Sequence, residues 1–208
     1  VLADTIIKEQ IPNVQLLTAL KTMPPAVRAL CKGETKIDGF LAPGHVAVIT
    51  GEGPWHQLAA AQGLPFVISG FTGEELLCSL YALVRLAGQG VCKNLYPTAV
   101  RPEGNPAARA LVDQYFEPTD AAWRGLGILP GSGLVLRPQY QHLDAGSAQL
   151  TTDAAAQSGC RCAQVITGAI PPTACSLFGT ACTPGTPRGA CMVSGEGSCH
   201  NAYLNHRM

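Results

Sequence analysis

Charged residues are scarce in this chain of 208 residues: they make up 13% of it, and the 14 basic and 14 acidic side chains cancel. A balanced charge provides no electrostatic footprint for nucleic acid or for an anionic membrane surface. The sequence also lacks an apolar run of the roughly 18–20 residues that a membrane-spanning helix needs. The longest run, residues 76–87, is interrupted by Ser79 and Arg85. We therefore expect neither a nucleic-acid partner nor a membrane span.

The first residues lack an initiator methionine and the charged and apolar regions of a secretory signal. The chain opens directly in a predicted helix that runs into a predicted strand, so we expect it to be the C-terminal part of a longer protein. Because nothing indicates secretion, we expect a cytoplasmic location, where disulfides rarely persist.

Short apolar runs alternate with helical patterns over the first two-thirds of the chain. Strands are predicted over residues 14–20, 37–42, 65–68 and 126–129, and helices over residues 24–32, 55–62, 73–87 and 107–116. In the helix at 73–87, Thr72 and Glu75 form a capping box and leucines repeat at helical spacing. Strands separated by helices of this length favour parallel βαβ units. We therefore predict a Rossmann-like α/β region, a parallel sheet flanked by helices, over residues 1–136.

Several single residues of this region have an expected structural place. Cys78 and Cys31 are expected in the core, because free cysteine is often buried as a small hydrophobe. Trp55 and Trp123 are expected to pack in the interior. Neither Gly-x-Gly-x-x-Gly nor the P-loop pattern occurs, so we predict no nucleotide site here.

Cysteine is concentrated near the end of the chain, where six of the nine fall within forty residues. The six are Cys160, Cys162, Cys175, Cys182, Cys191 and Cys199. After Gly159 the sequence is rich in Cys, Gly, Pro, Ser and Thr and has few large apolar residues. Such a segment cannot build much core, and a metal site is a usual remedy in small modules. We predict that residues 137–208 comprise a connection and a metal-binding module.

Three kinds of cross-link compete for these cysteines. Structural zinc usually has Cys-x2-4-Cys pairs, whereas the only short pair here is Cys160-Arg161-Cys162. Disulfides need an oxidising compartment. An iron–sulfur cluster needs four thiolates, accepts longer and irregular spacings, and would leave two of the six cysteines as non-ligands. Spacing and composition favour the cluster but leave all three open.

A series of short motifs extends over nearly the whole chain. They are residues 41–46 (LAPGHV), 49–51 (ITG), 101–106 (RPEGNP), 123–127 (WRGLG), 128–138, 159–162 (GCRC), 175–179 (CSLFG), 182–184 (CTP) and 189–194 (GACMVS). Taken together and in this order, they resemble the HypD family of hydrogenase maturation proteins. Each motif alone is a weak signal, and the joint match is specific.

The resemblance implies an assembly scaffold with redox chemistry. Such a scaffold helps to build the Fe(CN)2CO unit of nickel–iron hydrogenases with a small HypC-type chaperone and a HypE-type cyanide donor. It also implies a C-terminal [4Fe–4S] cluster held by a C-x14-C-x6-C-x16-C pattern. Read onto this chain, the pattern selects Cys160, Cys175, Cys182 and Cys199.

The remaining candidate residues follow from the same resemblance. Cys162 and Cys191 are left as neighbouring thiols or alternate ligands. His45, in a Pro-Gly loop after a predicted strand, and Glu103, in an Arg-Pro-Glu-Gly-Asn loop, are the candidate catalytic residues.

The chain departs from the family pattern in two places. It lacks the Cys-Gly-Thr-His and Cys-Pro-x-Cys motifs, whose thiols in the family bind the transient iron with its CN and CO ligands. It also has Gly70-Phe71-Thr72-Gly73 where many members have Gly-Phe-Glu-Pro, and so lacks that loop's carboxylate. We therefore expect the cluster to exchange electrons with thiols of a missing N-terminal half.

Two other hypotheses compete with this one. The first is a self-contained electron-transfer or disulfide-reducing protein resembling ferredoxin–thioredoxin reductase, with Cys162 and Cys191 as its second thiol pair. The other is a zinc-stabilised interaction module without redox chemistry.

Overall fold

The computed structural model describes residues 1–33, 35–123, 125–147 and 159–205. The chain divides into two compact units that interleave along the sequence. The first comprises Val1–Thr18, Asp38–Glu117 and Leu134–Ser147, and the second comprises Ala19–Ile37, Pro118–Gly133 and the described residues from 159 onward. The predicted division into residues 1–136 and 137–208 stays a prediction. The later part of the predicted connection, residues 148–158, lies outside the described residues.

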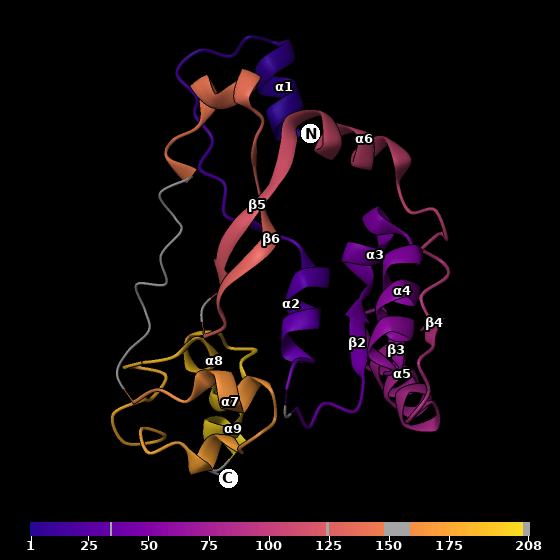
Figure 1. The fold of residues 1–208 in the computed structure, drawn as a ribbon, viewed down its shortest axis with the longest axis vertical. Coiled ribbons are helices and arrows are strands. Elements are labelled where there is room, and N and C mark those ends of the chain that lie inside the picture. The colour runs from indigo at the N-terminus through magenta and orange to yellow at the C-terminus, as the bar shows by residue number, and fades with distance from the viewer. Residues whose placement is uncertain (34, 124, 148–158, 206–208) are drawn as a thin grey trace. The chain divides into compact units, whose positions relative to one another are not determined.

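A three-stranded parallel sheet forms the centre of the first unit (Figure 1). Its strands β2 (Phe40–Pro43), β3 (Phe66–Ser69) and β4 (Cys92–Asn94) lie in that order, and Ala42 is opposite Ile68 in the register. β3 is buried along its whole length, as expected of a central parallel strand. The predicted parallel sheet with flanking helices is thus confirmed.

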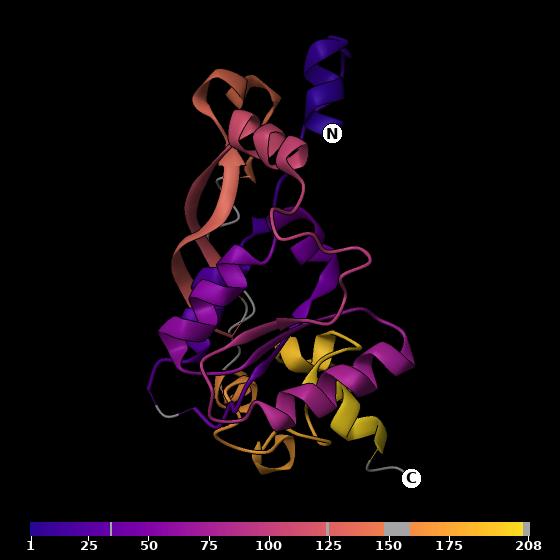
Figure 2. The same cartoon turned by 90° about the vertical axis from the view of Figure 1, so that its right-hand side faces the viewer.

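Helices cover both faces of this sheet. Three of them connect its strands: α3 (Gly44–Thr50), α4 (Gly53–Gln62) and α5 (Gly73–Arg85). Phe66 of β3 contacts Trp55 of α4, with ring centroids 6.4 Å apart. Ser69, three positions further along β3, accepts a hydrogen bond from the Ser79 hydroxyl of α5 at 2.8 Å. Because side chains alternate along a strand, these contacts lie on opposite faces, and Figure 2 shows helices on either side of the strands.

The N-terminus of α5 confirms the predicted capping box. The Thr72 hydroxyl accepts the backbone N–H of Glu75 at 3.3 Å, and the Glu75 carboxylate accepts the backbone N–H of Thr72 at 2.9 Å. The Thr72 hydroxyl also donates to the Glu75 carboxylate at 2.9 Å. The two bonds that the carboxylate accepts, the one from the backbone N–H first, lower the pKa of the Glu75 carboxyl. Two N–H groups that have no partner within the helix are satisfied in this way.

Replacing Thr72 with alanine removes the side-chain cap of α5. We expect the Thr72→Ala variant to lose about 1 kcal/mol of unfolding free energy. Thr72→Ser keeps the hydroxyl and is the matched control, with a much smaller loss. Urea denaturation followed by circular dichroism measures both, and equal losses in the two variants would contradict a role for the hydroxyl.

One expectation about α5 is wrong: Cys78 is exposed rather than in the core. Leu80 and Val84 of the same helix are also 49% and 74% exposed. The reason is that the small Ser79, which is fully buried, takes the position against β3, where its hydroxyl reaches Ser69. The helix is thereby rotated so that most of its large side chains point outward.

The other cysteine and tryptophan expectations have mixed outcomes. Trp55 is 3% exposed, which confirms its packing role. Trp123 is half-buried, and its indole N–H donates to the Ser132 hydroxyl at 2.8 Å. Cys31 is half-buried at the end of α2, and burial raises the pKa of its thiol.

Further helices complete the first unit: α1 (Leu2–Lys8), α6 (Pro106–Tyr115) and the 3-10 helix η1 (Pro138–Leu143). The buried Tyr115 joins all three. Its hydroxyl donates to the Asp4 carboxylate of α1 at 2.6 Å, and its ring lies 5.0 Å from that of Tyr140 in η1. The bond to Asp4 raises the pKa of Tyr115 to about 12.

Residues 14–20 do not form the predicted buried strand. Val14 and Leu17 are 37% and 63% exposed, and the strand there, β1, is limited to Leu20–Lys21. A buried strand needs cover on both faces, which this exposed segment does not have.

β1 belongs instead to a second three-stranded sheet, in the order β1-β6-β5. β5 (Phe116–Trp123) was not predicted, and β6 (Gly127–Leu136) extends the strand predicted at 126–129. The second unit also contains short helices: α2 (Met23–Leu30), α7 (Cys162–Ile166), η3 (Pro172–Ala174), α8 (Ala190–Val193) and α9 (Ser198–Asn205). None of the described helices is long and apolar enough to cross a membrane.

Candidate metal-binding site

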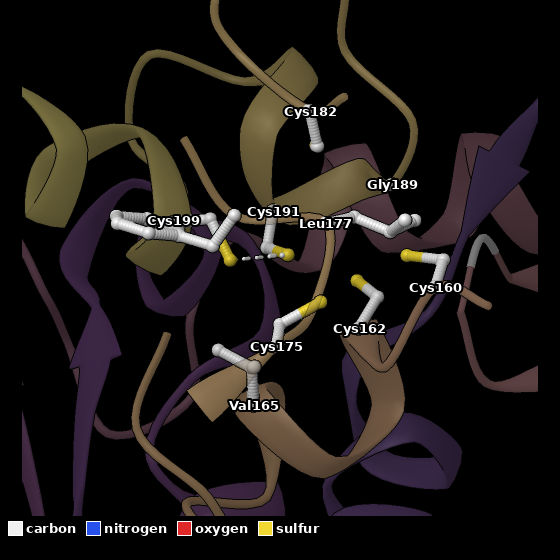
Figure 3. Close-up of a pocket in the computed structure, with 10 residues that line it drawn as sticks. Cys160, Cys162, Val165, Cys175, Leu177, Cys182, Gly189, Cys191 and Cys199 are labelled. Carbon is white, nitrogen blue, oxygen red and sulfur yellow. Dashed lines mark hydrogen bonds between the residues drawn. The ribbon is translucent and has the colours of Figure 1, made fainter. Parts of the chain in front are cut away.

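One small cavity in the second unit is lined by all six C-terminal cysteines (Figure 3). Its other lining residues are Val165, Leu177, Phe178 and Gly189. Five of the cysteines are buried, and Cys160 is half-buried. Four of the buried cysteines form the core of this part of the chain together with Val165 and Met192: Cys162, Cys182, Cys191 and Cys199. The segment after Gly159, which has few large apolar residues, is therefore packed largely around its own cysteine side chains.

The cysteines reach the cavity from different local structures. Cys162 begins α7, Cys175 follows η3, Cys191 lies in α8 and Cys199 in α9. Short helices can place these thiols because each one directs a single cysteine toward the cavity, and the chain then continues as a loop.

Cys175 and Cys182 are the two ends of a tight loop. The N–H of Phe178 donates to the Cys175 carbonyl at 2.9 Å, and the N–H of Cys182 donates to the Leu177 carbonyl at 2.8 Å. Gly179 takes a φ of +72° between them, a conformation that glycine adopts without strain. The loop that begins with the Cys-Ser-Leu-Phe-Gly motif thus holds two of the cysteines that line the cavity.

The sulfur atoms converge on the cavity. Figure 3 shows those of Cys160, Cys162 and Cys175 pointing toward its middle. The Cys191 thiol donates to the Cys199 sulfur at 3.1 Å. Converging thiols are a ligand set for soft or thiophilic metals.

Backbone N–H groups also reach these sulfur atoms. The N–H of Arg188 donates to the Cys182 sulfur at 3.3 Å. The N–H groups of Cys191 and Ala190, at the start of α8, are directed at the Cys162 sulfur, and that of Cys162 at the Cys160 sulfur. Such bonds stabilise a thiolate over a thiol.

Glycine is required where the cysteines crowd together. A Cβ added at Gly189 would lie 2.5 Å from the Cys160 sulfur and 3.3 Å from the Cys162 Cβ. A Cβ added at Gly197 would overlap the carbonyl oxygen of Cys191. The glycines of this segment are therefore part of its packing and not only loop residues.

The protonation of the metal-free thiols follows from burial. Burial raises the pKa of the Cys160 and Cys199 thiols. A hydrogen bond with the Cys191 side chain, and then burial, raises the pKa of Cys162 strongly. Without a metal these three thiols are protonated at neutral pH, and metal binding would release their protons.

The thiols do not form a ready-made site for a single ion among the described residues. In the parts of the chain that the structure describes, no group of three or more His, Cys, Asp or Glu side chains is placed to hold one ion. Yet six cysteines line the same cavity. The cavity holds only about 10 Å³ in this structure, so its size does not choose between an iron–sulfur cluster and a tetrahedral zinc ion, and the cluster stays a prediction.

The two candidate catalytic residues lie in the first unit. His45 is the second residue of α3 and is exposed, with its ring centroid 5.2 Å from that of the exposed Phe71. Glu103 is exposed, and its carbonyl oxygen accepts a bond from the Arg109 guanidinium at 3.5 Å. Among the described residues, neither the His45 nor the Glu103 side chain makes a hydrogen bond or an ion pair. Their catalytic role stays a prediction.

The sequence did not reveal a polar network beside the carboxyl ends of the strands. Asn94, the last residue of β4, donates from its amide to the Glu52 carboxylate at 2.9 Å and to the Val100 carbonyl at 3.1 Å. Its side-chain oxygen accepts the Tyr96 N–H at 2.8 Å. Burial, then the charge of Glu52, raises the pKa of Cys92 to about 12, so this thiol is inert. These residues hold the loop after β4 in place.

The family described as HypD, hydrogenase formation hypA family, has a model that matches residues 1–206. The chain belongs to the HypD family. This confirms the resemblance carried by the motifs. It does not decide which of the six cysteines bind metal, so the set Cys160, Cys175, Cys182 and Cys199 stays a prediction.

Curated relatives share the family name. The hydrogenase maturation factor HypD of Rhizobium leguminosarum is 41% identical over 190 residues, which are 88% of this chain and 49% of the relative. HypD of Rhodobacter capsulatus is 36% identical over 202 residues, 92% of this chain and 54% of the relative. HypD of Cupriavidus necator is 34% identical over an alignment of 209 positions that covers 93% of this chain and 54% of the relative. The chain thus spans about half the length of the HypD proteins it matches.

Proposed function

We propose that this chain serves nickel–iron hydrogenase maturation by holding a [4Fe–4S] cluster in its C-terminal cysteine cavity. The observation that carries the proposal is the convergence of six cysteines on one enclosed space. Its biological context comes from the HypD family, whose members are named hydrogenase maturation factors.

The cavity suits an iron–sulfur cluster chemically. Its lining offers thiols and apolar side chains and no carboxylate or imidazole. Thiolates are the usual ligands of such clusters. We assign Cys160, Cys175, Cys182 and Cys199 as the ligands, because their spacing follows the family pattern. Cys162 and Cys191 are then neighbouring thiols.

When bound, the cluster supplies or accepts single electrons. The chain's own residues set the conditions around it. Val165, Leu177 and Phe178 keep water from the sulfur atoms. The N–H of Arg188 bonds the Cys182 sulfur and disperses its charge, which raises the potential relative to a site without that donor.

The full maturation reaction involves more than these 208 residues. We propose a scaffold that assembles the Fe(CN)2CO unit in the cytoplasm with a small HypC-type chaperone and a HypE-type cyanide donor. The cysteine motifs that hold the transient iron in the family do not occur in this sequence, so that iron would be held elsewhere. The cluster would exchange electrons with those thiols, whose redox state sets whether iron is held.

A disulfide-reducing protein, like ferredoxin–thioredoxin reductase, is the second candidate. The observation that favours it is the hydrogen bond between the Cys162 and Cys191 side chains, which makes them a ready thiol pair beside the proposed ligands. Trapping a mixed disulfide with a substrate protein at either cysteine would support this function. Their burial argues against it, because reactive cysteines are usually accessible and have a lowered pKa.

Metal analysis tests the cluster directly. We expect the anaerobically purified chain to contain about four irons and four acid-labile sulfides per molecule. Zinc is measured in the same sample. Stoichiometric zinc without sulfide would show that the cavity holds a structural ion instead, and the proposed function would be wrong.

A further inference from the structure

The outward side of α5 carries an apolar stripe, which we call the α5 outer face. It consists of Leu77, Leu80, Tyr81 and Val84. These side chains are 70%, 49%, 68% and 74% exposed. Their spacing of i, i+3, i+4 and i+7 places them along one side of the helix.

The opposite side of α5 already packs on the sheet. Ser79 is fully buried there, and Leu83 approaches Gly39 so closely that an added Cβ would lie 2.9 Å from it. α5 is therefore apolar on two sides, and only one is needed for the fold. Scattered exposed leucines are ordinary in proteins, but a contiguous apolar patch marks a contact surface.

A groove of about 290 Å³ runs beside this stripe. It is lined by Cys78, Tyr81, Ala82, Arg85, Leu86, Lys93 and Leu95. Two of these residues are cations, and no carboxylate is among them. Within the described parts of the chain, neither Arg85 nor Lys93 has an ion-pair partner. The groove therefore combines an apolar lining with two cations that have no ion-pair partner among the described residues.

We propose that the α5 outer face and this groove bind an amphipathic helix of a partner protein whose apolar stripe is flanked by carboxylates. In helix-in-groove recognition the docking helix places its own apolar residues at i, i+3, i+4 and i+7, and here these would pack on the α5 stripe and in the groove beside it. The carboxylates would pair with Arg85 and Lys93. This surface lies in the first unit, and the inference does not depend on the proposed cluster.

A second copy of the chain fits the surface less well. Two antiparallel α5 helices would bring Glu74 of one to Arg85 of the other, but Lys93 would gain no acidic partner.

Peptide binding to the full chain tests the inference. The probe is a fluorescein-labelled helical peptide of roughly 20 residues, with leucines at i, i+3, i+4 and i+7 flanked by glutamates. Two comparison peptides are used: one has lysine in place of each glutamate, and the other has the same composition in scrambled order. By fluorescence anisotropy, we expect the glutamate peptide to bind at least about tenfold more tightly than either.

Paired variants assign the binding to this surface. Arg85→Glu with Lys93→Glu should reverse the preference in favour of the lysine peptide. The double variant Leu77→Ser with Val84→Ser should bind the glutamate peptide about tenfold or more weakly than the unchanged chain does. Lys21→Glu with Arg28→Glu makes the same charge change at exposed cations elsewhere and should leave the preference unchanged.

Three outcomes would overturn the inference. One is equal affinity for the glutamate and lysine peptides, and another is a loss of binding in the Lys21/Arg28 control as large as in the Arg85/Lys93 variant. The third is a dimer in sedimentation that Tyr81→Glu dissociates, which would make a second copy the occupant. Iron and sulfide content should be the same in all α5 variants, so a failure here is distinguishable from a failure of the cluster proposal.

Discussion

The Cys175→Ser and Cys182→Ser variants are expected to lose the cluster, so that iron and sulfide fall from about four each to near zero. Both cysteines are more than 90% buried and line the cavity from the two ends of one tight loop. Serine is nearly the same size, so the loop should still fold. Its hydroxyl is a hard, neutral ligand that does not replace a thiolate on iron.

Matched cysteine variants give this prediction its specificity. Cys78→Ser changes an exposed thiol of the first unit and should retain the full iron content. Cys162→Ser and Cys191→Ser should also retain it, because the spacing pattern does not select them. Loss of iron in Cys78→Ser would make the ligand assignment wrong. Loss in Cys162→Ser, with retention in Cys175→Ser, would mean that a different four of the six cysteines bind the cluster.

Gly197→Ala is expected to lower the free energy of unfolding of the second unit by about 3 kcal/mol. It should also reduce the cluster content of the chain. The added Cβ would overlap the carbonyl oxygen of Cys191 and lie 2.7 Å from its carbonyl carbon. Backbone atoms cannot rotate away as a flexible side chain can. The chain between α8 and α9 must therefore shift, and it carries Cys191 and Cys199 with it.

Gly195→Ala is the matched control two residues earlier. An added Cβ there meets no atom within 4 Å, and the residue is not among the glycines with positive φ. We expect a change within about 0.5 kcal/mol. Thermal unfolding followed by circular dichroism, together with iron content, measures both variants. Equal stability of the two would show that the turn at Gly197 is looser than its packing indicates.

Local patterns were sufficient for much of the α/β region. The capping box of Thr72 and Glu75 and the apolar run of β3 depend on neighbours in sequence, and both were predicted correctly. β5 was missed because its sequence, which contains Pro118 and Asp120, has weak strand preference. Pairing with β6, which no local pattern reports, decides that segment.

α5 shows where periodicity misleads. Its leucines repeat at helical spacing, which correctly predicts a helix but not which side is buried. The buried side is the one that carries Ser79, whose hydroxyl donates to that of Ser69 on the sheet. Nothing in the local sequence marks Ser79 as the residue that packs on the sheet, because its hydrogen-bond partner, Ser69, lies ten residues earlier in the chain. The exposed stripe, and with it the proposed partner surface, followed only from the tertiary structure.

The cysteines divide in the same way. Order along the chain is enough to show the family, the number of C-terminal thiols and the match of Cys160, Cys175, Cys182 and Cys199 to the family's spacing pattern. That all six thiols line one cavity is visible only in the folded chain, since they come from separate turns and short helices. Burial and sulfur contacts depend on distances between segments, and those distances exist only after the chain has folded.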